Sequence, residues 1–209
     1  MKNFKITAKE DGKEYWISRA MAVTGIIRVI KFPTVPNTPN PEIYFLLSKR
    51  GPGCPDHVGK WQCTCGYLDF DETLADAVLR EVKEELGLDI AEVLLDDPET
   101  KNIMPNKIPK ILDFRLLEIR DNPEVDSRQN VTFRYLFDVN YDWIKELLDN
   151  GTVNGDTESR GGESGEIEEI KLIPSSEINT APYDKNFAFN HQEILNELSG
   201  NGKTCSDPS

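Results

Sequence analysis

The chain has 209 residues, which is enough for one well-buried domain and short for two. Charged residues make up 29% of it, no apolar run approaches the ~20 residues that a membrane-spanning helix needs, and residues 1–20 lack an apolar signal core. We therefore expect a water-soluble, cytoplasmic protein with no membrane partner. The net charge of −13 disfavours duplex nucleic acid as a partner, because duplex-binding proteins neutralise phosphates with a basic surface.

The predicted elements begin with a hairpin in residues 1–20, around the turn-forming dipeptide Asp11-Gly12. Strands and helices then interleave, which predicts a single layered domain of the α/β or α+β class over residues 1–200. We expect a mobile, glycine-rich loop at 151–165 and a disordered tail at 201–209. The expected strands are 22–30, 42–47, 61–65, 108–119, 131–140 and 167–173, and the expected helices are 73–86, 141–148 and 186–198.

The clearest predicted helix, residues 73–86, has two contrasting faces. Glu81, Glu84 and Glu85 are spaced i, i+3, i+4 and therefore share one side. An apolar stripe marks the other side, and Gly87 follows where a left-handed cap is expected. The stripe comprises Ala75, Val78, Leu79, Val82 and Leu86. The acidic side is either a solvated surface or a site for hard cations, which prefer carboxylate oxygens.

The sequence around this helix favours the cation site. It reads Gly66, five residues, Glu72, seven residues, then Arg80-Glu81-Val82-Lys83-Glu84-Glu85-Leu86-Gly87-Leu88. This segment resembles the Nudix box, G-x5-E-x7-R-E-U-x-E-E-x-G-U, in which U is aliphatic. All nine specified positions match within 23 residues. By this resemblance we identify the chain as a member of the Nudix hydrolase family.

The resemblance implies a fold and a metal site. The fold is an α/β/α sandwich with a mixed β-sheet, in which the box helix carries the metal site. The glutamates of that helix bind Mg²⁺ or Mn²⁺ in the family. Carried over by position, the metal ligands are Glu81, Glu84, Glu85 and the backbone carbonyl of Cys65, beside a tight turn at Gly66.

The implied reaction is hydrolysis of a pyrophosphate bond in a nucleoside diphosphate linked to a moiety X, by metal-activated water. Glu72 and Arg80 would orient and neutralise the metal ligands. The general base is a box glutamate or a glutamate from a later loop. Outside the box the candidates are Glu163, Glu166 and Glu168, of which we favour Glu166, although a solvated loop charge is the commoner role for such a residue. The sequence identifies neither X nor the number of metal ions.

Four residues suggest a second kind of site. Cys54, His57, Cys63 and Cys65 lie within twelve residues, and such side chains can hold a structural Zn²⁺. Their spacing is not a common zinc-finger pattern, so we favour reduced thiols. We expect His191 to pack at the start of a helix rather than act as a base.

Two other functional classes stay open. A catalytically silent Nudix-like domain would bind a nucleotide and act as a regulatory module, and a structural zinc module would have no catalysis. The intact glutamate set favours the enzyme, with a small-molecule nucleotide as its partner. Homodimers are common in the family, so a homodimer is also expected.

Overall fold

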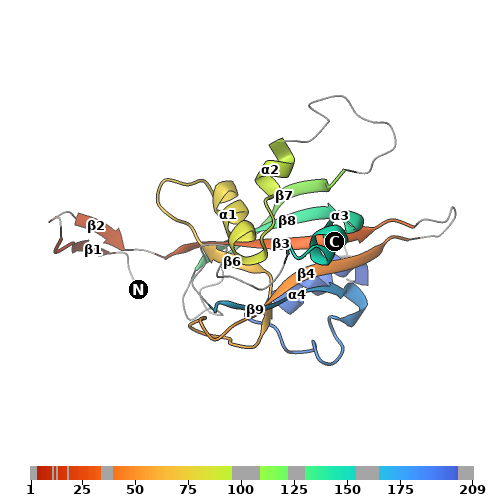
Figure 1. Ribbon diagram of the computed structural model, residues 1–209. Coiled ribbons are helices and arrows are strands. Elements are labelled where there is room, and N and C mark those ends of the chain that lie inside the picture. Colours follow the sequence, from red (N-terminus) through yellow and green to blue (C-terminus); the bar gives the residue numbers. More distant parts are fainter. Residues whose placement is uncertain are drawn as a thin grey trace, which may run out of the picture.

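A mixed sheet of seven strands forms the centre of the molecule (Figure 1). The strand order is β5-β4-β3-β8-β7, with β6 also pairing with β3 and β9 with β4. β3 and β8 run parallel, whereas the other pairs are antiparallel. The strands are β3 (Met21–Lys31), β4 (Glu42–Arg50), β5 (Trp61–Gln62), β6 (Thr64–Tyr67), β7 (Ile111–Arg120), β8 (Val131–Asn140) and β9 (Ile167–Pro174).

The computed structural model describes residues 4–10, 12, 14–17, 19–33, 40–95, 109–121, 130–153 and 165–201. Most of the loop expected at 151–165 and nearly all of the tail expected at 201–209 therefore lie outside the described residues. Within the described residues, no helix is long and apolar enough to cross a membrane.

Helices cover both faces of the sheet. Successive side chains of a strand point to opposite faces, so the apolar residues of one strand contribute to two separate clusters. On β3, Val23, Ile27 and Val29 join one buried cluster, and Ile26 joins the other. The first cluster includes side chains of α1 (Leu74–Leu86), α2 (Ile90–Leu95) and α3 (Tyr141–Asp149). The second includes α4 (His191–Asn196). Figure 1 shows α1 and α2 on one side of the sheet and α4 on the other. The predicted α/β/α layering is confirmed.

The N-terminal strands form a sheet of their own. β1 (Phe4–Thr7) and β2 (Glu14–Ile17) pair antiparallel, with Phe4 opposite Ile17 and Thr7 opposite Glu14. Figure 1 shows this two-stranded unit projecting away from the seven-stranded sheet. Asp11 of the expected turn lies outside the described residues.

Several predicted boundaries need correction. The C-terminal helix begins at His191 rather than at residue 186. Phe187 instead forms an isolated bridge with Trp61, and Phe189 has a φ of 52°, which is incompatible with a continuous helix. The expected strand 61–65 is two short strands, β5 and β6. The short helix α2 was not predicted, and a 3-10 turn (Ser175–Glu177) and a π-helical turn (Glu197–Asn201) flank the C-terminal region.

Candidate active site

Helix α1, which carries the three glutamates, is fixed at both ends by its own sequence. Thr73 precedes the helix, and its Oγ1 accepts a hydrogen bond from the Asp76 N–H at 3.2 Å. The Asp76 carboxylate accepts in return from the Thr73 N–H at 3.3 Å, which completes a capping box. At the other end Gly87 adopts the predicted left-handed conformation, with a φ of 71°. The glutamates therefore lie on a helix with defined limits.

Close packing holds α1 against the sheet. Its buried residues are Ala77, Val78, Val82 and Leu86, so Ala77 rather than Ala75 completes the apolar stripe. A Cβ atom at Gly25 of β3 would lie 2.9 Å from Cγ2 of Val82, so a glycine there lets helix and strand approach closely.

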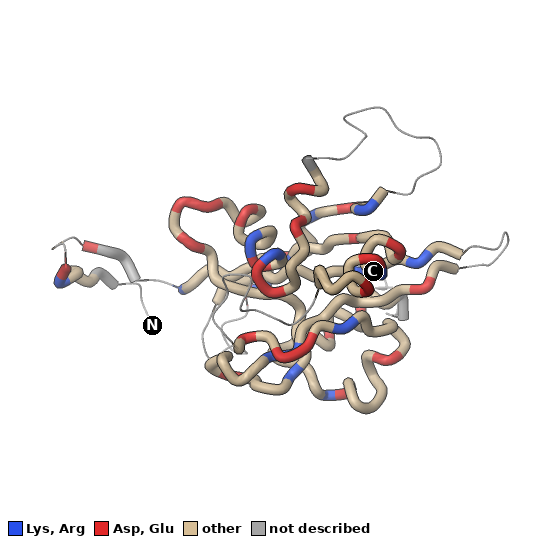
Figure 2. The backbone as a smooth tube through the Cα atoms, in the orientation of Figure 1, with Lys and Arg blue, Asp and Glu red and all other residues tan. Residues whose placement is uncertain are grey.

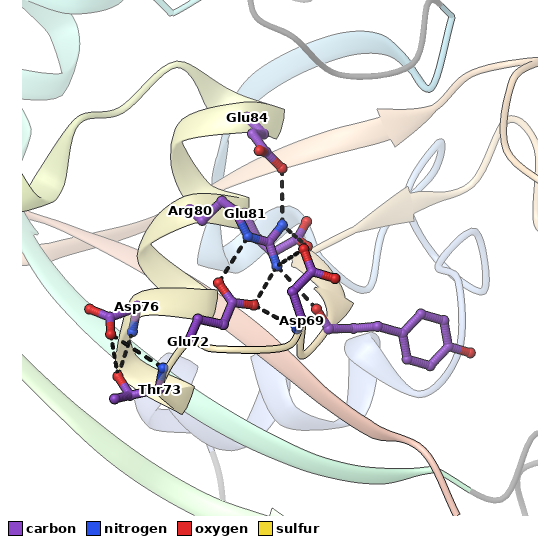
Figure 3. Close-up of polar contacts among 8 residues, drawn as sticks. Asp69, Glu72, Thr73, Asp76, Arg80, Glu81 and Glu84 are labelled. Carbon is purple, nitrogen blue, oxygen red and sulfur yellow. Dashed lines mark hydrogen bonds and ion pairs between the residues drawn. The ribbon is translucent and has the colours of Figure 1, made fainter. Parts of the chain in front are cut away.

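Arg80 binds three of the four glutamates of the box (Figure 3). Its Nη1 donates to Oε1 of Glu81 at 2.7 Å and to Oε2 of Glu84 at 3.1 Å. Its Nε and Nη2 donate to the two carboxylate oxygens of Glu72 at 3.1 and 2.8 Å. One guanidinium thus offsets repulsion between Glu81 and Glu84 while Glu72 fixes its orientation.

Glu85 and Glu81 are carboxylates in a poorly solvated environment. Glu85 accepts hydrogen bonds from the Cys65 N–H and from Nε2 of Gln62, both at 3.3 Å. Burial, followed by the charge of Glu81, raises the pKa of Glu85 well above its usual range. Burial also raises the pKa of Glu81, although Arg80 opposes this. A nearby positive charge would stabilise both ionised side chains.

Gly66 brings the Glu81 carboxylate against strand β6. A Cβ atom at Gly66 would lie only 1.9 Å from Oε1 of Glu81, so no other residue type fits without moving that side chain. Gly66 pairs with Val23 inside the sheet, so the prediction of a tight turn at Gly66 is wrong. The glycine is required for close approach and not for an unusual backbone conformation.

A cavity of about 720 Å³ lies next to these carboxylates. Its lining includes Glu81 and Glu85, and its volume is typical of a small-molecule site. Its lining also includes Arg50, Arg134 and Phe189, none of which the sequence indicated as a site residue. The sequence signal for Arg134 is its place between Phe133 and Tyr135 in a mostly apolar strand, because charged residues are rarely buried without a partner.

The three candidate bases outside the box have different surroundings. Glu166 lines the cavity, and its charge contributes to the raised pKa values of Glu81 and Glu85. Glu168 forms an exposed ion pair with Lys49 at 2.7 Å. Glu163 lies outside the described residues. Of the two candidates that the structure describes, Glu166 is the one that lines the cavity together with Glu81 and Glu85.

The cysteine and histidine residues have separate partners. Cys54 donates to the carbonyl of Glu166 at 3.2 Å, Cys63 is buried in the second core cluster, and the His57 ring packs on Phe189. Within the described ranges, no group of three or more His, Cys, Asp or Glu side chains is gathered as a ready metal site. This holds for the proposed zinc ligands and also for the three glutamates, two of which bind Arg80.

His191 begins α4 and is buried, in agreement with its predicted packing role. Its Nδ1 accepts a hydrogen bond from the Cys63 N–H at 3.0 Å. Burial lowers the pKa of His191 to about 3, so the ring is neutral near pH 7. The neutral His191 ring, held by the Cys63 N–H, therefore links the start of α4 to the residue between β5 and β6.

A family model described as the NUDIX domain matches residues 35–198, more than half of the chain. The chain belongs to the Nudix family.

Curated relatives of this Nudix protein are distant. An RNA pyrophosphohydrolase of Campylobacter jejuni is 28% identical over 116 residues, covering 47% of this chain and 72% of the relative. One of Gluconacetobacter diazotrophicus is 45% identical over 49 residues, and the match spans 23% of this chain and only 29% of the relative. A Mycobacterium tuberculosis protein named as a candidate 8-oxo-dGTP diphosphatase is 28% identical over 109 residues, covering 48% of this chain and 76% of the relative.

Solved structures share the fold. A mutT/nudix family protein from Listeria innocua matches with a TM-score of 0.54 and 20% identity, over 87% of this chain and 92% of that protein. The NUDIX domain of Shewanella oneidensis NrtR, solved with ADP ribose, matches with a TM-score of 0.53 and 16% identity, over 88% and 89%.

Proposed function

We propose that this Nudix protein hydrolyses a pyrophosphate bond in a nucleoside diphosphate linked to a further group, using Mg²⁺ or Mn²⁺. The observation that carries the proposal is the pair Glu81 and Glu85, two carboxylates whose pKa values are raised by burial, in the wall of a cavity of about 720 Å³. The names of the curated relatives support the same bond class, since an RNA pyrophosphohydrolase and an 8-oxo-dGTP diphosphatase both act on phosphoric anhydrides.

The donor set suits a hard divalent cation. Glu81, Glu84 and Glu85 offer carboxylate oxygens, and the backbone of Cys65 lies beside Glu85. To bind a cation, Glu81 and Glu84 would give up their hydrogen bonds to Arg80 and coordinate the cation instead. Arg80 would keep its two hydrogen bonds to Glu72. When bound, the cation would offset the charge of the diphosphate and lower the pKa of a water molecule.

The protein's own residues would perform the remaining tasks. Arg50 is buried in the cavity wall, with its Nη2 2.9 Å from Oδ1 of Asp56, and it supplies a fixed positive charge for the diphosphate. Glu166 lies in the same wall and is our candidate for the carboxylate that takes the proton from water. Glu85 is the alternative base, because its raised pKa favours proton uptake.

The test is a substrate panel with Mg²⁺: dNTPs, ADP-ribose, NADH, dinucleoside polyphosphates, sugar nucleotides and 5′-triphosphorylated RNA. We expect release of phosphate, pyrophosphate or a monophosphate from at least one of them. Glu84→Gln should lower kcat by about 100-fold or more, since one displaced electrostatic group costs on the order of 10²–10³ in rate. Glu92→Gln, a change at an exposed glutamate of α2, is the matched control and should leave kcat unchanged.

Two results would contradict the proposal. One is tight nucleotide binding without turnover of any compound, which would favour the regulatory domain. The other is turnover that Glu84→Gln and Glu92→Gln affect equally, which would place the chemistry elsewhere.

A further inference from the structure

Gln62 is a buried glutamine in the cavity wall, and both ends of its amide are in use. It is the second residue of β5 and is 1% exposed. Its Oε1 accepts a hydrogen bond from Nη1 of Arg50 at 2.5 Å, and its Nε2 donates to Oε2 of Glu85 at 3.3 Å. One amide therefore joins the arginine assigned above to the diphosphate and a carboxylate assigned above to the cation.

The surrounding donors and acceptors allow only one orientation of this amide. The thiol of Cys65 also donates to Oε1, at 3.8 Å, so the oxygen end contacts donors while the nitrogen end contacts a carboxylate. A flipped amide would place its N–H groups against those of Arg50 and its oxygen against Glu85. The side chain is thus matched to one cationic and one anionic neighbour.

The backbone that carries Gln62 is held on two sides. Gln62 itself pairs with Ser48 of β4. The preceding residue, Trp61, forms a bridge with Phe187, and its N–H donates to the carbonyl of Asn186 at 3.0 Å. A side chain that orients other groups has to start from a rigid element, and these contacts supply one.

Arg50 and Glu85 each have a separate second anchor. Nε and Nη2 of Arg50 donate to the carbonyl and to Oδ1 of Asp56, at 3.0 and 2.9 Å. Glu85 accepts from the Cys65 N–H at 3.3 Å. These anchors fix each group on its own side of the cavity, whereas Gln62 bonds to both and so fixes one relative to the other.

We propose that Gln62 is a positioning residue, which holds the carboxylate that binds the cation in register with the guanidinium that binds the diphosphate. The inference rests on the proposed function, in which Glu85 and Arg50 have these roles. A diphosphate bound to a cation has to contact both groups at once. Loss of their alignment therefore weakens both contacts, although Gln62 itself contacts neither ligand.

The test measures binding to the full chain without catalysis, with two probes. Mn²⁺ alone is followed by the paramagnetic resonance signal of the free ion in about 0.15 M KCl, which screens the acidic surface. Imidodiphosphate, a diphosphate analogue, is titrated by calorimetry in excess MgCl2. Gln62→Met keeps the length of the side chain and removes both hydrogen bonds. It should weaken each probe by about tenfold or more, as expected when a residue that orients a metal ligand is lost.

Two further variants separate positioning from stability. Gln62→Asn keeps a buried amide that is too short to reach both partners, so it should show the same losses even if Gln62→Met does not fold. Gln192→Met is the matched control, because it removes hydrogen bonds to the Ile178 carbonyl and to Asn179 outside the cavity lining. It should lower the free energy of unfolding and leave both affinities within about twofold.

A spectroscopic signal reports on the amide directly. The chain has three glutamines, so side-chain amide labelling with ¹⁵N gives few resonances, and the one lost in Gln62→Met belongs to Gln62. Saturating MgCl2 should shift the Gln62 resonance, because its acceptor Glu85 then shares its oxygens with the cation. The Gln192 resonance should not move.

Unchanged affinity for both probes in the two Gln62 variants would overturn the inference. A loss confined to one probe would also overturn it, since Gln62 would then serve only one partner, and so would a Gln62 resonance that saturating MgCl2 leaves in place. Hydrolysis fails by a different result, which is intact Mn²⁺ binding without turnover of any compound in the substrate panel. That result would leave the positioning role of Gln62 standing.

Discussion

At the scale of single residues, Gly66 determines where a carboxylate can lie. Its backbone is ordinary extended strand, and the space beyond its Cα is taken by the Glu81 side chain. The sequence pattern required a glycine at this position but gave the wrong reason for it. The structural reason is steric, and it links strand β6 directly to the acidic face of α1.

Replacing this glycine should separate activity from folding. Gly66→Ala places a Cβ 1.9 Å from Oε1 of Glu81, so the carboxylate must move. We expect kcat to fall by about 100-fold, as for the loss of one positioned group, whereas the free energy of unfolding should change by less than about 1 kcal/mol, because the displaced atoms belong to the end of a flexible side chain. Steady-state kinetics and urea unfolding would measure the two effects. Gly151→Ala is the control, because a Cβ there meets nothing within 4 Å and only the positive φ is penalised. Unchanged kcat in Gly66→Ala would show that the position of Glu81 is not critical.

The residues of the site differ in how well sequence could predict them. Glu81 and Glu85 follow from helical spacing, since residues three or four positions apart share one face. Arg134 and Phe189 come from β8 and from the segment before α4, and only the pairing of β8 with β3 and the packing of α4 bring them to the cavity. No local pattern encodes that proximity.

At the scale of elements, the boundaries that depend on a local sequence pattern were predicted correctly, and those that depend on contacts between distant segments were not. β8 has the predicted limits because its apolar run is bounded by polar residues at both ends. The predicted C-terminal helix begins five residues too early, because Phe187 has no local signal against a helix but pairs with Trp61, which is distant in the chain. Helix α2 has only six residues, too few for a helical period to stand out.

The capping box of α1 gives a prediction at this scale. Thr73→Ala removes the acceptor for the Asp76 N–H and should lower the free energy of unfolding by about 1 kcal/mol. Asp76→Ala should cost a similar amount, and the double variant should cost less than the two changes added together, because both remove one reciprocal interaction. Urea unfolding of the three variants would measure this. Since the glutamates lie at the far end of the helix, kcat should stay within about twofold. Additive losses would mean that the two bonds act independently.

At the scale of the whole molecule, negative charge is a general property and not a mark of the site. Figure 2 shows acidic residues spread over helices, strands and loops alike. With a net charge of −13, the protein is stabilised by any dissolved cation that screens the repulsion between its acidic residues. Stabilisation by Mg²⁺ bound at a specific site has to be distinguished from this general screening.

Glu85 allows that separation. Because burial raises its pKa in the folded protein, the folded state takes up a proton more readily, and keeping Glu85 ionised near pH 7 costs stability. This cost is absent at low pH and grows as pH rises past the usual carboxylate range. We expect Glu85→Gln to raise the melting temperature at pH 7 in the presence of EDTA. Excess MgCl2 should raise that of the unmodified protein by several degrees, roughly 2–4 °C for each kcal/mol of binding energy.

Scanning calorimetry with KCl at matched ionic strength is the control, because it screens charge without occupying a carboxylate site. Glu85→Gln should lose most of the MgCl2 response and keep the KCl response. Equal MgCl2 shifts in both proteins would show that Mg²⁺ acts through the general acidic surface.

The parallel pairing of β3 with β8 also determines when the central sheet can be completed while the chain is being translated. Arg28 and Asp138 of these strands are 110 residues apart in sequence yet joined by two hydrogen bonds of 2.7 Å. Until residue 140 has emerged, the nascent chain exposes one edge of an apolar strand at the centre of its future sheet. The antiparallel neighbours β4 and β6 are available long before that, and they leave this edge unprotected. Chaperone occupancy during translation should therefore persist until β8 is released.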